Sequence, residues 1–385
     1  MNKYGFTEDQ LMIRDLARQI AREQIEPVRA KYDISGEFPW DIVKILADAG
    51  LFGVYIPEEY GGTGGGILEM AFVTEELSRV CGGIALSFAA TGLGTYPILL
   101  FATPEQKAKY LPDLAAGRKL AAFGLTEPQA GSDAGAIKCS AVQKGDRWVI
   151  NGMKQWITNG GEADIYSVVV NTDPHKGARG ATAFIIEKGT PGFSFCKKED
   201  KMGIRASATR ELIFEDCEVP AENMLGRRGL GFMVAMGTFD RTRPGVAAQA
   251  VGIAQGALDA ATAYAKQREQ FGKSIINFQG IQWMLADMAT QIEASRALVY
   301  ASARLIDSGA KSISKLSAMC KLFASDVAMK VTTDAVQIFG GYGYMREYPV
   351  EKMMRDAKIT QIYEGTNQIQ RGVIAQELIR ELASK

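Results

Sequence analysis

The stretch DRWVINGMKQWIT, residues 146–158, alternates apolar and polar side chains, the period-two pattern of a half-buried β-strand. It contains Asn151-Gly152, a dipeptide typical of a two-residue hairpin turn. Further strand-like runs follow, each bounded by Gly, Pro, Asn or Asp: DIYSVVV, ATAFIIEK, GFSFCKK and ELIFEDCEVP. Together they predict a small antiparallel barrel or sandwich of about a hundred residues.

On both sides of this β region the apolar spacing changes to that of amphipathic helices. Upstream, FPWDIVKILADAGLFG and ILEMAFVTEELSRVCGG stop at glycines, and Thr103-Pro104 is typical of a helix start. Downstream, long Ala- and Gly-rich helical runs continue to Lys385. The sequence therefore predicts an α+β protein with an N-terminal α-helical domain (1–120), a middle antiparallel β domain (121–226) and a C-terminal four-helix-bundle-like domain (227–385).

Composition narrows the class of protein. The 44 basic and 44 acidic side chains give a formal net charge of zero, which argues against binding to nucleic acid or an anionic membrane through bulk charge. We expect no membrane span, because no apolar run is judged to reach the ~18 residues needed, and the N-terminus does not resemble a signal peptide. Five scattered cysteines without CxxC spacing fit reduced thiols. A cytoplasmic location is the resulting expectation.

Several catalytic classes are disfavoured. One histidine, His175 in a turn-rich segment, argues against a Ser-His-Asp or Cys-His hydrolase and against a His-rich site, so we expect no metal. No GxGxxG follows a strand, and QFGKS lacks the earlier glycine of a phosphate loop, which disfavours Rossmann dehydrogenases and P-loop NTPases. A general base, if there is one, would be a carboxylate, a lysine or a tyrosine.

Three stretches remain as candidate site segments: GLTEPQAGSD (124–133), QWITNGG (155–161) and QIYEGTNQIQR (361–371). Each also has an ordinary structural interpretation, as a domain linker, a core tryptophan and a solvated acid at a helix end. In the third, Glu364 is the only acid, and Gly365 follows it. Burial among apolar neighbours would raise the pKa of that carboxyl, and the glycine would expose a backbone N–H beside it. Such a pair suits removal of a proton alpha to a carbonyl, and a redox cofactor would then have to accept the second hydrogen.

The chain resembles the acyl-CoA dehydrogenases over essentially its whole length, through LTEPQAGSD, WITNGG, FDRTRP, QREQFGK, DAVQIFGGYGY and EYPVEKMMRDAKITQIYEGTNQIQR. The similarity is greatest to the short- and medium-chain branch. It implies FAD-dependent α,β-dehydrogenation of an acyl-CoA thioester, with electrons passed to an electron-transfer flavoprotein, by a homotetramer built as a dimer of dimers. It also implies the family's α–β–α fold.

The resemblance assigns roles residue by residue. Glu364 would be the catalytic base, and the cofactor-binding set would be Phe123, Leu125, Thr126, Ser132, Trp156, Thr158, Arg268, Phe271, Gln279, Gln337, Gly340, Gly341, Thr366 and Gln368. Part of this set, namely Arg268, Gln279 and the QIFGG stretch, would reach the FAD of a neighbouring subunit. The substrate-binding set would be Ser132, Asp240, Arg243, Glu364 and Gly365.

Some alternatives stay open. One branch of the family carries its base at the position of Thr242, and threonine cannot serve as that base, so a short, medium or alicyclic acyl group is favoured. Thr91, Thr95 and Tyr96 would form a somewhat polar pocket floor, or would be ordinary helix packing. A flavin oxidase on the same fold and a non-catalytic acyl-CoA-binding homologue are the competing functions.

Overall fold

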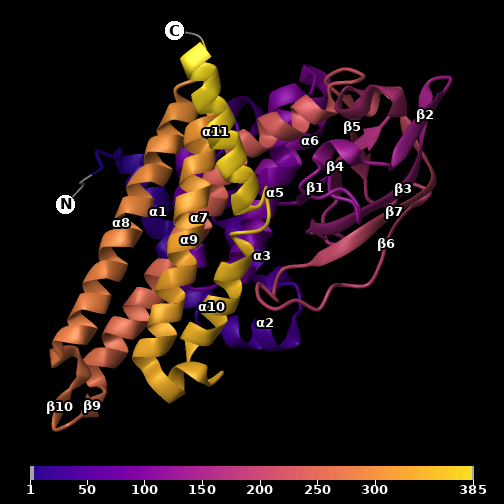
Figure 1. The fold of residues 1–385 in the computed structure, drawn as a ribbon. Coiled ribbons are helices and arrows are strands. Elements are labelled where there is room, and N and C mark those ends of the chain that lie inside the picture. Colours follow the sequence, from indigo (N-terminus) through magenta and orange to yellow (C-terminus); the bar gives the residue numbers. More distant parts are fainter. Residues whose placement is uncertain (1–3, 384–385) are drawn as a thin grey trace.

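The computed structural model describes residues 4–383, and it has the predicted order of helices, then sheet, then helices (Figure 1). The predicted fold class is confirmed. The helical bundle stands on one side and the β domain lies against its flank. The division at residues 120 and 226 stays a prediction.

The N-terminal helices are α1 (Glu8–Ile20), α2 (Arg29–Ser35), α3 (Trp40–Asp48), α4 (Ile67–Ser78), α5 (Gly82–Phe101) and α6 (Pro104–Ala115). Helix α6 begins as its sequence predicts, because the Thr103 hydroxyl accepts a hydrogen bond from the Gln106 N–H and Pro104 occupies the first turn. Local sequence thus sets where this helix starts.

Helix α5 corrects one expectation. Its 20 residues are long and apolar enough to cross a membrane by length and composition, although no such run was expected. Within the structure, however, 72% of its most apolar window is buried by other parts of the chain. The helix is apolar on all sides because it packs on all sides, as a central core helix does.

The middle strands are β1 (Ala121–Gly124), β2 (Ser140–Lys144), β3 (Arg147–Thr158), β4 (Ile165–Asn171), β5 (Ala181–Glu187), β6 (Phe193–Phe195), β7 (Thr209–Pro220) and β8 (Met224–Leu225). They form one sheet in the order β6-β7-β3-β2-β4-β5-β8, with β1 paired to β4. Most pairings are antiparallel as predicted, but β1–β4 and the single β2–β4 pair are parallel.

The predicted hairpin at Asn151-Gly152 is wrong. These residues lie inside β3, where the pairing with β7 shifts register between Ile150 and Gly152. The turn is instead at Gly145-Asp146, because Lys144 pairs with Arg147 across it and Gly145 has a φ of 63°. Gly152 is needed for close approach, since a Cβ there would lie 2.8 Å from the Cys139 Cα.

The C-terminal helices are α7 (Gly231–Gln267), α8 (Gln279–Asp307), α9 (Ser314–Phe339), α10 (Pro349–Ile359) and α11 (Asn367–Ala383), with a small hairpin of β9 (Glu269–Gln270) and β10 (Lys273–Ser274) at the far end of α7. The glycines of α7 let it touch the N-terminal domain. A Cβ on Gly252 would lie 2.2 Å from the Glu75 carbonyl oxygen, and one on Gly256 would lie 2.0 Å from that of Arg79. Helices α4 and α7 therefore pack backbone to backbone.

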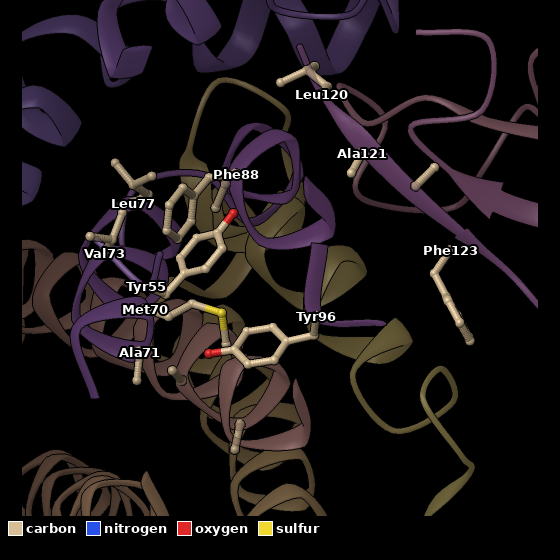
Figure 2. Close-up of a cluster of buried hydrophobic side chains, with 14 of the residues drawn as sticks. Tyr55, Met70, Ala71, Val73, Leu77, Phe88, Tyr96, Leu120, Ala121 and Phe123 are labelled. Atoms are coloured by element: carbon tan, nitrogen blue, oxygen red, sulfur yellow. The ribbon is translucent and has the colours of Figure 1, made fainter. Parts of the chain in front are cut away.

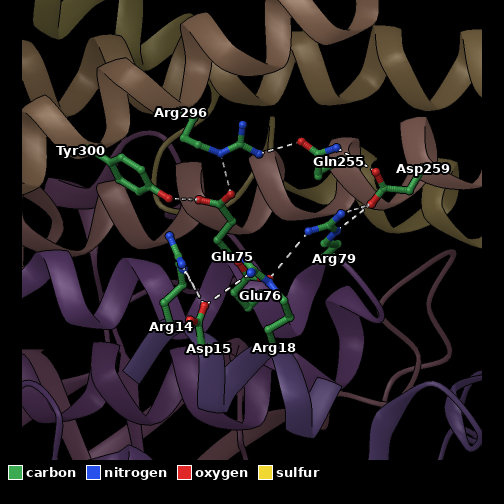
Figure 3. Close-up of polar contacts among 10 residues, drawn as sticks. All are labelled: Arg14, Asp15, Arg18, Glu75, Glu76, Arg79, Gln255, Asp259, Arg296 and Tyr300. Atoms are coloured by element: carbon green, nitrogen blue, oxygen red, sulfur yellow. Dashed lines mark hydrogen bonds and ion pairs between the residues drawn. The ribbon is translucent and has the colours of Figure 1, made fainter. Parts of the chain in front are cut away.

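Two contacts fix the domains to one another. Figure 2 shows buried side chains of the N-terminal helices, such as Met70, Phe88 and Tyr96, in the same hydrophobic cluster as Ala121 and Phe123 of strand β1. Figure 3 shows a polar network between α4 and the bundle, in which Glu75 accepts hydrogen bonds of 2.7 Å from both the Arg296 Nε and the Tyr300 hydroxyl of α8. The junctions between the domains are thus closely packed, one through apolar side chains and the other through hydrogen bonds and ion pairs.

Candidate active site

The main candidate site is a cavity where α4, α5, β1, β3, α7 and the turn after α10 meet. It encloses about 840 Å³, including open space at its mouth. Its lining is mostly apolar and consists of Met70, Leu86, Ala89, Ala90, Leu93, Phe123, Leu125, Thr126, Trp156, Ile157, Thr158, Phe239, Thr242, Gly245, Val246, Gln249, Tyr363 and Glu364. Glu364 is the acidic residue among these, so any proton chemistry in the cavity centres on it.

Glu364 sits on a strained turn between α10 and α11. Its φ is 53° and that of Gly365 is 93°, so both residues occupy the left-handed region. A non-glycine residue there costs free energy and is held by its surroundings. Within residues 4–383 the Glu364 N–H donates no hydrogen bond. The turn therefore presents a carboxylate and an unengaged backbone donor from one residue.

The pKa of the Glu364 carboxyl is raised from its ordinary value of 4.5 to about 7. Burial is the main cause, because loss of hydration disfavours the charged form. The carboxylate faces the cavity and keeps part of its surface accessible, yet protein atoms surround it. The Thr242 hydroxyl donates a 2.7 Å hydrogen bond to its Oε2, and this bond, with the Arg243 and Lys321 charges, partly opposes the rise. A carboxylate with a pKa near 7 is matched to general-base work at neutral pH.

The opposite wall comes from the β domain and holds five of the predicted cofactor residues: Phe123, Leu125, Thr126, Trp156 and Thr158. The β3–β7 register shifts between Lys154 and Ile157, and Trp156 has a φ of 58°. This irregularity leaves the indole 56% exposed instead of packed in the core. No hydrogen bond joins the Thr126 or Thr158 hydroxyl to another group in the described chain. A flat aromatic face with two unengaged hydroxyls fits a planar heteroaromatic ring system such as a flavin.

Models of known families match three consecutive parts of the chain. They are the acyl-CoA dehydrogenase N-terminal domain at residues 7–118, the middle domain at 122–217 and the C-terminal domain at 229–379. The chain belongs to the acyl-CoA dehydrogenase family. It is an enzyme of this class, and the family is one of flavoproteins.

Three relatives illustrate the match. The short-chain-specific acyl-CoA dehydrogenase of Clostridium acetobutylicum is 51% identical over 98% of this chain and 100% of its own. Cyclohex-1-ene-1-carbonyl-CoA dehydrogenase of Syntrophus aciditrophicus is 49% identical over 97% and 90%. A chain from the structural study of the electron transferring flavoprotein of Acidaminococcus fermentans is 54% identical, with a TM-score of 0.96 over 98% of this chain and 100% of that one.

The other positions that the family resemblance singles out lie away from the cavity lining. Arg268, Gly340 and Gly341 line a second hollow at the far end of the bundle. Phe271, on the β9–β10 hairpin near it, is 94% exposed with a φ of 52°. The rest of the distant set is exposed, or partly so in the case of Thr366, and consists of Ser132, Gln279, Gln337, Thr366 and Gln368. One chain therefore does not gather the whole predicted cofactor set.

Asp240 and Arg243, predicted to hold the CoA moiety of an acyl-CoA dehydrogenase substrate, form an ion pair of 2.8 Å. Arg243 is only 4% exposed, and its Nε donates a 3.3 Å hydrogen bond to the Glu364 carbonyl. Its guanidinium thus supports the base-bearing turn from inside the protein.

The suggested polar floor is wrong. The cavity lining includes Leu86, Ala89, Ala90 and Leu93 of α5 but not Thr91, Thr95 or Tyr96. The two threonine hydroxyls donate instead to carbonyls one turn back in the same helix, at 2.8 and 2.7 Å. These residues belong to the same helix as the lining residues, but the face of α5 that lines the cavity is the one that carries Leu86, Ala89, Ala90 and Leu93.

Sequence reasoning missed the groups behind the Glu364 turn. Lys321 on α9 and Gln370 on α11 are both fully buried, and both donate hydrogen bonds to the Gly365 carbonyl, at 2.8 and 2.9 Å. A signal was present for Lys321: it lies three or four residues from Ser317, Ala318, Ala324 and Ser325, all on the buried face of α9. A lysine on the inward face of an amphipathic helix is unusual enough to be noted.

Proposed function

We propose that this enzyme introduces a double bond between the alpha and beta carbons of an acyl-CoA thioester, with Glu364 as the base and FAD as the cofactor. The observation that supports it most is the pairing, on one residue inside an apolar cavity, of a carboxylate with raised pKa and an unengaged N–H. This pair fits a thioester whose alpha carbon faces the carboxylate and whose carbonyl oxygen accepts from the N–H.

The chain's own groups would share the work as follows. Glu364 takes the alpha proton on a carboxylate oxygen, and Thr242 orients the carboxylate through the 2.7 Å hydrogen bond. The N–H stabilises the negative charge that develops on the thioester oxygen, and the apolar lining excludes water. FAD, packed against Trp156 with Thr126 and Thr158 at its ring, would accept the beta hydrogen as hydride.

We further propose that the enzyme is a homotetramer, built as a dimer of dimers, in which Arg268, Gln279 and the QIFGG stretch (Gln337, Gly340 and Gly341) contact FAD of a neighbouring subunit. Phe271 would pack against the dinucleotide. The 94% exposed Phe271 supports this, since a large apolar side chain so exposed is typical of an interface. Ser132, Thr366 and Gln368 would complete the cofactor site in the same chain, and Ser132 with Asp240 and Arg243 would serve the CoA portion.

The proposed substrate is a short- to medium-chain or alicyclic acyl-CoA. The apolar side chains of α5 and α7 around the cavity support an uncharged acyl group, and two relatives are named for short-chain and cyclohexene carbonyl substrates. An electron-transfer flavoprotein is the proposed redox partner, supported by the match to a chain from the study of such a protein. A cytoplasmic location completes the proposal.

Replacement of Glu364 by Gln tests the function. The variant should fold, bind FAD and bind an enoyl-CoA product, but anaerobic bleaching of its flavin by butyryl-CoA should be slowed by roughly 10⁴-fold or more, because no group remains to take the proton. Stopped-flow absorbance measures this rate. Bleaching at the wild-type rate would eliminate Glu364 as the base.

A further inference from the structure

We infer that Lys321 is a positioning residue for the reaction, which holds the Glu364–Gly365 turn from behind through a charged hydrogen bond and keeps a positive charge next to the base. This inference rests on the proposed role of Glu364 as the base. Its starting point is geometry: the Lys321 Nζ lies 2.8 Å from the Gly365 carbonyl oxygen and 2.9 Å from the Asn367 Oδ1.

The burial of Lys321 is not explained by stability. Its side chain is fully buried, and both groups that it contacts are neutral. Burying an ammonium without a carboxylate in contact costs free energy. An uncharged side chain of similar volume would avoid this cost, so the buried ammonium lowers the stability of the fold.

Hydrogen-bond satisfaction does not explain it either. The Gly365 carbonyl also accepts from the Gln370 Nε2 at 2.9 Å, and the Asn367 Oδ1 is within 3.2 Å of the Ser325 hydroxyl. If the lysine were replaced, the Gly365 carbonyl would therefore keep a donor. The Asn367 Oδ1 could take the single Ser325 hydroxyl proton, which otherwise lies 2.7 Å from the Lys321 carbonyl oxygen. The replacement would remove the positive charge and would leave the turn less firmly held. The remaining donor, the Gln370 amide, is itself held less firmly, because its buried oxygen has no hydrogen-bond partner in the described chain.

The anchor acts on the reactive group through the backbone. Glu364 and Gly365 both hold left-handed φ values, and this conformation is retained only while the carbonyls of the turn are fixed. The Glu364 carbonyl is fixed by Arg243 and Gln370, at 3.3 and 3.1 Å. Lys321 fixes the next carbonyl, so the two anchors together set the direction of the Glu364 carboxylate and N–H.

Charge is the second contribution. The groups that face Lys321 are Glu364, Arg243 and Asp326, and burial lowers the pKa of the Lys321 ammonium to about 7. While it is protonated, Lys321 favours the ionised form of Glu364 and so limits the rise in the pKa of that carboxyl. Without Lys321, the pKa of Glu364 should move upward.

The experiment uses the full-length holoenzyme with three variants: Lys321→Met, Lys321→Gln and Ser325→Ala. Met removes the donor and the charge at similar volume, whereas Gln restores a neutral donor. Ser325→Ala is the matched control, since Ser325 is equally buried, lies one turn along the same helix and touches the same Asn367, but it does not touch Gly365. Flavin reduction by butyryl-CoA is followed from pH 5.5 to 9, with titration by enoyl-CoA product and thermal unfolding in parallel.

Lys321→Met should slow flavin reduction roughly 10- to 100-fold, because a small displacement of a reacting group lowers the rate strongly. The affinity for product should change less than about threefold. The acidic limb of its pH–rate profile, where the rate of flavin reduction falls as the base is protonated, should move to higher pH. Its melting temperature should be unchanged or higher. Lys321→Gln should recover part of the rate but not the position of the limb, and Ser325→Ala should behave as wild type.

Three results would overturn the inference: a wild-type rate in Lys321→Met, an equal loss in Ser325→Ala, or a loss that accompanies a lower melting temperature with an unmoved limb. Glu364→Gln separates the two hypotheses. If that variant is inactive while Lys321→Met is normal, only the role of Lys321 fails. If Glu364→Gln is active, the proposed function itself fails.

Discussion

The two walls of the cavity are each supported by a fully buried lysine, but the lysines differ in their partners. Behind the β wall, the Lys154 Nζ pairs with the Glu127 Oε1 at 2.6 Å and donates to the Leu125 carbonyl at 3.1 Å. Glu127 in turn accepts from the backbone N–H groups of Lys138 and Cys139, at 2.6 and 3.0 Å. Behind the base wall, the contacts of Lys321 are neutral.

This difference separates a structural lysine from a functional one. A charge paired with a carboxylate in a satisfied network stabilises the loop that follows β1, where Leu125 and Thr126 line the cavity. Lys321 has no contacting carboxylate and lies beside a base with a raised pKa. Its charge therefore affects the reactivity of that base and lowers the stability of the fold. A fully buried lysine thus stabilises the β wall, where it is paired, and destabilises the base wall, where it is not.

The largest expected effect is on stability and concerns Lys154→Met. Glu127, 2% exposed, would keep its charge without its partner, so the free energy of unfolding should fall by about 3–5 kcal/mol. Lys321→Met leaves no such carboxylate in contact and should change it by less than about 1 kcal/mol. Denaturant unfolding of both variants measures the contrast. Adding Glu127→Gln to Lys154→Met should recover part of the loss, and equal losses in the two single variants would remove the distinction between the walls.

A smaller effect is expected from the cavity hydroxyls. Thr242→Val removes the hydrogen bond that favours ionised Glu364, so the pKa of that carboxyl should rise and the acidic limb of flavin reduction should move to higher pH. At pH 7 the rate should fall roughly tenfold. Thr158→Val, on the β wall, makes no contact with the carboxylate and should leave the limb where it is. A limb that moves equally in both variants would contradict the assignment of the base to one wall.

A further effect is a pH dependence of stability. The pKa of Glu364 is higher in the folded protein than its ordinary value of 4.5, so between pH 4.5 and about 7 the folded state binds more protons than the unfolded state. The contribution of this group is therefore fully present below pH 4.5 and is lost as pH rises through about 7. Glu364→Gln should remove this dependence. The melting temperature of the variant should therefore rise relative to that of wild type as pH rises. A constant difference between the two proteins across this range would show that the carboxyl is not desolvated.

Much of the fold could be predicted because its signals are local. Periodicity, caps and glycines identified the helices and most strands, and the Thr103 cap is where the sequence places it. The hairpin prediction failed because the Asn151-Gly152 dipeptide does not specify which residues pair. The turn is at Gly145-Asp146, and Gly152 lies at a register shift between β3 and β7. Strand register depends on partners far along the chain, so a local dipeptide could not decide it.

The sequence by itself determined the α–β–α order, the family and the isolation of Glu364 among uncharged neighbours, since these follow from residue types and their spacing. Only the tertiary structure decided that Thr242, Arg243 and Lys321 converge on that turn, that α5 presents alanines and leucines to the cavity in place of Thr91 and Thr95, and that Trp156 stays exposed. The physical reason is distance. A pKa and a strained backbone depend on groups that lie within a few ångströms in space but more than a hundred residues apart in the chain for Thr242, and such contacts leave no pattern in local sequence.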